Sequence, residues 1–153
     1  MKYIIRILTI LSISIGLADA SPTEEALRFV EAMKLGNNIK VLSFRAAQRT
    51  NTFAIMQNNI GYEKAKAALT NELNKSISKH QAQWNQNLAL AYLEYFTPEE
   101  LNSISQEKQS SPHAKKFITS QSKVGASMQK TSKGLLEKII TEAVKNAYTN
   151  TLQ

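Results

Sequence analysis

Hydrophobic residues recur every three or four positions along most of the chain after residue 20. The first stripe consists of Ala26, Phe29, Val30 and Met33. It follows the segment Ser21-Pro22-Thr23-Glu24, in which Ser21 can cap a helix, proline suits the first helical position and Glu24 can reach back to the cap. Gly36 and Asn37 are typical of a helix end. The pattern predicts a first helix between these signals.

Two longer stripes come next. One is weakened around Arg49 and Thr50, ends at Gly61, and consists of Ile39, Leu42, Ala46, Phe53, Met56 and Ile60. The other keeps helical spacing through Ala65, Ala68, Leu69, Leu73, Ile77, Trp84, Leu88, Tyr92, Tyr95 and Phe96. Residues 62–96 therefore fit one long helix, or two with a bend near His80.

The helix-start signal is repeated at Thr97-Pro98-Glu99-Glu100, where a short helix with Leu101 and Ile104 on its buried side is expected. Ser110-Ser111-Pro112 restarts the chain, and the final stripe is Phe117, Val124, Met128, Leu135, Ile139 and Ala143. No comparable stretch alternates with a period of two, so we expect no sheet. The sequence predicts an all-α, single-domain bundle of about five helices.

The first twenty residues have the pattern of a secretory signal peptide. Lys2 and Arg6 supply the positive end, residues 7–17 are apolar apart from Thr, Ser and Gly, and Ala18-Asp19-Ala20 has the form that a signal peptidase accepts. The apolar run is shorter than the roughly 20 residues that span a bilayer. We expect cleavage after Ala20, an exported domain over residues 21–153, and no transmembrane segment after cleavage.

Composition limits the chemistry of residues 21–153. They contain no Cys and no Asp, which excludes disulfides, thiolate metal sites and aspartate-based catalytic or metal sites. His80 and His113 are far apart, and the S-x-x-K matches at Ser76, Ser105 and Ser120 lack their companion motifs. No cofactor and no metal is predicted.

Positive charge is concentrated in the last third. Residues 21–107 contain nine Lys or Arg and nine Glu, whereas residues 108–153 contain eight Lys and two Glu. Five of these lysines fall within one narrow sector of the last helix at 100° per residue. We call them the lysine ridge: Lys116, Lys123, Lys130, Lys138 and Lys145. They either extend along the edge of the core into solvent or dock an anionic partner.

A resemblance supports the reading as an exported helical protein. Residues 84–101 contain Tyr92, Phe96-Thr97 and Glu100-Leu101 in the pattern Y-x-x-x-F-T-x-x-E-L, and residues 111–116 are similar to an S-P-x-G-x-K element. Both patterns resemble an uncharacterised bacterial exported family, domain of unknown function 2059. Ala114 replaces the family's glycine, and its Phe-Tyr pair is absent around Lys108 and Gln109. The resemblance implies an exported all-helical domain, with no activity or catalytic residues to carry over.

We therefore expect a periplasmic or secreted, non-enzymatic module that binds an acidic protein or an anionic envelope component through the lysine ridge. Nucleic acid fits less well, because residues 108–153 contain no Arg and few aromatic residues. One alternative is an envelope-polymer hydrolase that uses Glu94 and Glu100 as paired carboxylates. Another is a homo-oligomer that buries the wide apolar face near Ile140, Val144 and Tyr148.

Overall fold

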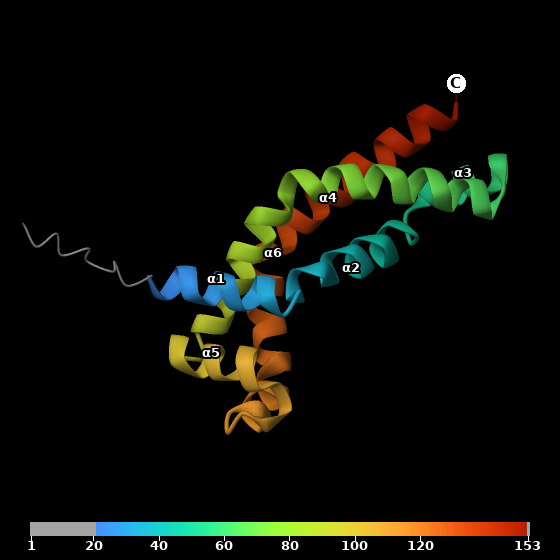
Figure 1. Ribbon diagram of the computed structural model, residues 1–153. Coiled ribbons are helices and arrows are strands. Elements are labelled where there is room, and N and C mark those ends of the chain that lie inside the picture. The colour runs from blue at the N-terminus through green and yellow to red at the C-terminus, as the bar shows by residue number, and fades with distance from the viewer. Residues whose placement is uncertain (1–20, 153) are drawn as a thin grey trace, which may run out of the picture.

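The computed structural model describes residues 21–152, and these form an all-α domain with no strand in that range (Figure 1). Residues 1–20, where the signal peptide is predicted, lie outside the described part. The elements in chain order are α1 (Pro22–Ala32), η1 (Leu35–Asn37), α2 (Asn38–Ala47), α3 (Asn51–Ile60), α4 (Tyr62–Leu93), α5 (Pro98–Glu107), η2 (Lys108–Ser110) and α6 (Ala114–Thr151). The predicted helical bundle is confirmed, with six α-helices in place of about five.

The additional helix arises where the second stripe is weakest. α2 ends at Ala47, and Thr50 then adopts an extended conformation and caps α3, its Oγ1 accepting a hydrogen bond from the N–H of Phe53 at 3.2 Å. The third stripe, in contrast, forms a single helix, since α4 is continuous from Tyr62 to Leu93. His80 therefore lies within an unbroken helix.

Both predicted capping boxes are present. Ser21 and Glu24 exchange hydrogen bonds of 2.9 and 3.3 Å at the start of α1, and Thr97 and Glu100 exchange bonds of 3.0 and 3.3 Å at the start of α5. These contacts satisfy backbone N–H groups that a helix start leaves without a partner. The start points read from the sequence were correct for both helices.

The end of α1 differs from the prediction. The helix stops at Ala32, and the reversal is made by Lys34 in the left-handed conformation, with φ 54° and ψ 29°. Gly36 has another role, because a Cβ at this position would lie 1.9 Å from Oδ1 of Asn85 in α4. The glycine lets η1 lie close to α4 without displacing the Asn85 amide.

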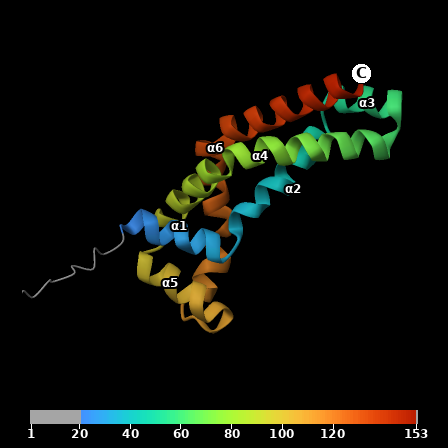
Figure 2. The same ribbon diagram turned by 45° about the horizontal axis from the view of Figure 1, so that its top comes forward.

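The long helices α4 and α6 run antiparallel and form the central pair of the fold (Figures 1 and 2). Contacts between them follow the antiparallel order, since Ser76 bonds Glu142, Asn87 bonds Ser132, and Glu94 bonds Ser127. Figure 2 shows that α6 changes direction along its length and stays beside α4. The shorter helices pack against this pair.

The core follows the predicted stripes. An aromatic cluster joins α1, α4 and α6, with the Phe29 ring 5.2 Å from Tyr92 and 6.0 Å from Phe117, and Tyr92 stacked on Phe117 at 5.8 Å. Leu42 is an exception, because this stripe residue is 42% exposed.

Within residues 21–152, no helix has the length and apolar run that a bilayer crossing needs.

The wide apolar face at the end of α6 is covered from within the chain. Ile139, Ala143 and Ala147 are fully buried and Val144 is nearly so, while Ile140 and Tyr148 pack at the edge of the core. α6 contacts α3 and α4 along this part. The face that the homo-oligomer hypothesis required is mostly internal.

Replacing Gly36 by alanine should destabilise the fold by about 1–3 kcal/mol, because the added Cβ displaces Asn85 from its place against η1. Gly125→Ala is the matched control. Its Cβ would meet nothing within 4 Å, and alanine favours the helix by about 1 kcal/mol. Urea unfolding measures both changes, and equal stability of the two variants would contradict the close approach.

Candidate functional site on helix α6

The structure places the whole lysine ridge on the exposed surface of α6. Lys123, Lys130, Lys138 and Lys145 form no ion pair and no side-chain hydrogen bond with any group in residues 21–152. Lys123 and Lys130 lie beside the buried residues Val124 and Ser127, at the edge of the core. Four ammonium groups of the ridge are therefore free to meet an anionic surface.

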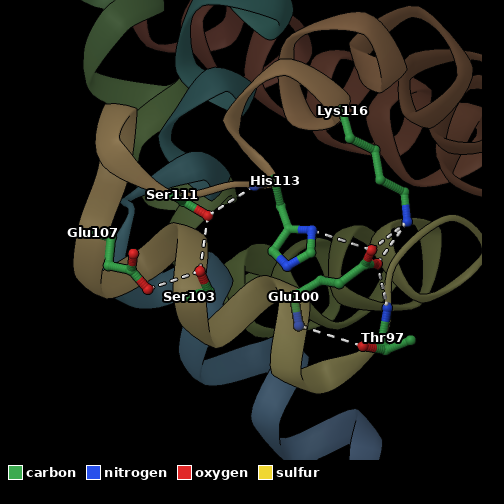
Figure 3. A network of polar contacts seen from close by, with 7 residues as sticks. All are labelled: Thr97, Glu100, Ser103, Glu107, Ser111, His113 and Lys116. Atoms are coloured by element: carbon green, nitrogen blue, oxygen red, sulfur yellow. Dashed lines mark hydrogen bonds and ion pairs between the residues drawn. The ribbon is translucent and has the colours of Figure 1, made fainter.

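Lys116 differs from the other four. Its Nζ lies 2.6 and 2.8 Å from the two carboxylate oxygens of Glu100 and 4.8 Å from the centre of the Phe96 ring. The pairing with the Glu100 carboxylate (Figure 3) and the attraction to the Phe96 ring fix the start of α6 against α5. The sequence predicted Lys116 as a partner-binding residue; in the structure its ammonium group is paired with Glu100 at the corner where α5 leads into α6.

Glu100 is the centre of this corner (Figure 3). Besides Lys116, its carboxylate accepts a hydrogen bond from the N–H of Thr97 and lies 3.4 Å from Nδ1 of His113. The hydrogen bond from Lys116 is the main cause that holds the pKa of Glu100 below its ordinary value; burial opposes it, and the Thr97 N–H and the charges of Lys116 and His113 assist. The carboxylate stays ionised and serves as a structural anion.

A second set of contacts closes the turn between α5 and α6. The Oγ atoms of Ser103 and Ser111 are 2.8 Å apart, Ser103 also donates to Glu107, and Ser111 accepts from the N–H of His113 at 3.1 Å (Figure 3). Ser111 is buried. The Ser-Pro restart seen in the sequence thus corresponds to a turn held by serine hydroxyls.

The two glutamates of the hydrolase alternative serve different contacts. Glu94 accepts a hydrogen bond from Ser127 Oγ at 2.5 Å, whereas Glu100 is held by the corner. Neither residue lines the apolar groove of about 720 Å³ that lies between α2, α4 and α6. The arrangement favours a role for both carboxylates in joining helices.

The S-x-x-K pair on α4 meets a carboxylate of α6. Ser76 Oγ donates a hydrogen bond to Glu142 Oε2 at 3.0 Å, and Lys79 binds the other oxygen of the same carboxylate. His80 Nε2 lies 3.9 Å from Glu142 Oε2. The hydrogen bonds from Lys79 and Ser76 lower the pKa of Glu142, against the effect of burial, and the charges of Lys79 and His80 add to them. The Ser76 hydroxyl joins α4 to α6 through this hydrogen bond. Because Ser76 is 1% exposed, its hydroxyl is also shielded from any substrate.

Metal-ligating side chains do not gather in the described part of the chain, since no group of three or more His, Cys, Asp or Glu forms there.

The structure does contain hollows that the sequence stripes did not reveal. An apolar groove of about 720 Å³ lies between α2, α4 and α6, and exposed Leu42 is part of its wall. Two more adjoin each other along α4, one facing the end of α1 and η1 and the other facing α2. The stripe pattern predicted Leu42 to be buried, so it gave no sign of this groove.

No family model, curated protein or solved structure matches the chain. The resemblance of residues 84–116 to domain of unknown function 2059 therefore stays a prediction. The structure accounts for part of that pattern physically, since Thr97 and Glu100 form a capping box and Ser111 closes the turn.

Replacing Glu142 by glutamine should lower the free energy of unfolding at neutral pH by roughly 0.5–1 kcal/mol, as expected for a partly exposed ion pair. Since the folded state lowers the pKa of Glu142, the stabilising effect is complete above the unfolded pKa of about 4.3 and is lost as the pH falls through the folded pKa. Urea unfolding over a pH series measures the difference from the natural chain. A difference that is the same at neutral and acidic pH would contradict the assignment.

Proposed function

We propose that the protein is an exported, non-enzymatic binding module for an anionic partner, either an acidic protein or an anionic component of the cell envelope. One observation carries the proposal: Lys123, Lys130, Lys138 and Lys145 are exposed on one helix and have no counter-ion among residues 21–152. They extend along 22 residues of α6, about 33 Å at 1.5 Å per residue.

The spacing suits a long charged partner better than a small ion. Successive lysines of the ridge are seven or eight residues apart, about 10–12 Å along the helix. This separation is similar to the Debye length at physiological salt, about 8 Å, so each lysine acts nearly independently. Each contact is weak, and affinity would come from several contacts made together.

Export is the part of the proposal that rests on the sequence of residues 1–20. The geometry at Ser21 is compatible with cleavage just before it, because the N–H of Ser21 already bonds the carboxylate of Glu24 at 2.9 Å. A new terminal amine at this position would carry a positive charge beside the same carboxylate. Cleavage would therefore leave the capped start of α1 in place.

The ridge is tested by replacing Lys123, Lys130 and Lys138 with glutamine. The control replaces Lys64, Lys115 and Lys133, which are exposed and lie off the ridge, so both variants lose the same net charge; of the three, Lys133 lies 3.8 Å from Glu137. We expect the ridge variant to be released from immobilised polyglutamate at a clearly lower salt concentration than the control.

Circular dichroism and urea unfolding check that both variants keep the fold. Equal release of ridge and control variants would show that retention reflects net charge alone, and this would contradict the ridge as a binding surface. Capture of an acidic envelope protein or polymer that salt releases from the natural chain, and that the ridge variant fails to capture, would identify the partner.

A further inference from the structure

A second basic surface lies along α4, opposite the end of α1, η1 and α2, apart from the lysine ridge. Two cavities of about 620 and 500 Å³ adjoin there and share Lys40, Asn74 and Ile77 in their walls. We call the combined hollow the basic trough. Along α4 it extends from Lys66 to Asn85, which is about 28 Å at 1.5 Å per residue.

The trough is positively charged. Lys34, Lys40, Arg45 and Lys66 are among its walls, and none of them forms an ion pair within residues 21–152. Glu31 is the acidic side chain of the same walls. Cations that surround a hollow are closer to a bound chain than cations on a convex helix, so their attraction is less screened.

The floor and the walls offer different contacts. Buried Leu73 and Ile77 form an aliphatic floor, and Val41 is 51% exposed beside it. The amide side chains of Asn37 and Asn74 line the wall and make no hydrogen bond to the described part of the chain. The trough thus combines apolar surface, unpaired amides that can donate and accept, and cations.

The backbone at one end of the trough is strained. Lys34 adopts the left-handed backbone conformation just after the end of α1, where glycine is the usual residue. Lysine costs stability at this position relative to glycine, and its side chain lines the trough. Strain of this kind is often kept where a side chain is needed for binding.

We propose that the basic trough binds an extended acidic peptide segment whose other side chains are apolar. An extended chain of about eight residues spans the 28 Å length at 3.3–3.6 Å per residue. Its carboxylates would meet Lys34, Lys40 and Arg45, its backbone amides would meet Asn37 and Asn74, and alternate apolar side chains would rest on Leu73 and Ile77. An acidic glycan fits less well, because the floor is aliphatic and Phe44 is the aromatic residue of the walls.

The test uses a fluorescent, end-blocked peptide of about eight residues that alternates glutamate and valine. The natural chain should bind it, whereas a peptide that alternates lysine and valine should not bind. Lys40→Gln with Arg45→Gln should weaken binding by about tenfold or more, since two charge-assisted contacts are lost. The control, Arg49→Gln with Lys64→Gln, removes the same charge from exposed positions outside the trough and should change affinity by less than about twofold.

Lys34→Gly separates binding from folding. Glycine relieves the left-handed backbone, so the urea midpoint should rise while affinity for the acidic peptide falls. A variant that is more stable and binds more weakly cannot owe its weaker binding to unfolding.

Three results would overturn the proposal: no binding of the glutamate–valine peptide by the natural chain, equal weakening by the trough and control variants, or binding of a uronic-acid oligosaccharide where the peptide does not bind. The ridge variant, with Lys123, Lys130 and Lys138 replaced by glutamine, should bind the peptide with the same affinity as the natural chain. Failure of the trough is therefore distinguishable from failure of the ridge.

Discussion

Polar contacts between α4 and α6, each with one buried partner, fix the pairing of the two central helices. Ser76, Ser127 and Ser132 are buried in this interface and bond to Glu142, Glu94 and Asn87, and buried Glu72 accepts from Asn150 at 3.3 Å. No buried side-chain polar atom in residues 21–152 is left without a partner. A shift of one helix by a turn would leave several of these groups unpaired, and each would cost about 1–3 kcal/mol. Apolar packing alone tolerates such shifts more readily, so the polar pairs specify the register.

The two basic surfaces lie on different elements of the bundle. The ridge belongs to α6 alone, while the trough requires α2 to lie along α4 at a fixed height, which Gly36 allows through its close approach to Asn85. Lys116 has a third role, because its bonds to Glu100 anchor the start of the helix that carries the ridge. Lysines of the same helix thus differ in their surroundings, because a carboxylate of the fold lies within reach of Lys116 and not of the other four.

Periodicity and capping chemistry were sufficient to predict the helices, because both act within a few residues. The stripes predicted the buried faces, and Ser21 and Thr97 predicted two helix starts. The end of α1 at Lys34 was missed because left-handed lysine has no sequence signature, and Gly36 was misread since its partner Asn85 is 49 residues away. The same limit applies to the sites: the angular position of the lysines on α6 was predictable, whereas the pairing of Lys116 and the trough depend on contacts between distant segments.

The most direct test of the α4–α6 register is a double-mutant cycle on Asn87 and Ser132, whose side chains bond at 2.9 Å across the interface. Urea unfolding of Asn87→Ala, Ser132→Ala and the double variant gives the coupling free energy. The account predicts a favourable coupling of about 0.5–1.5 kcal/mol. Additive effects of the two substitutions would show that these residues do not interact and would contradict the register of α4 against α6.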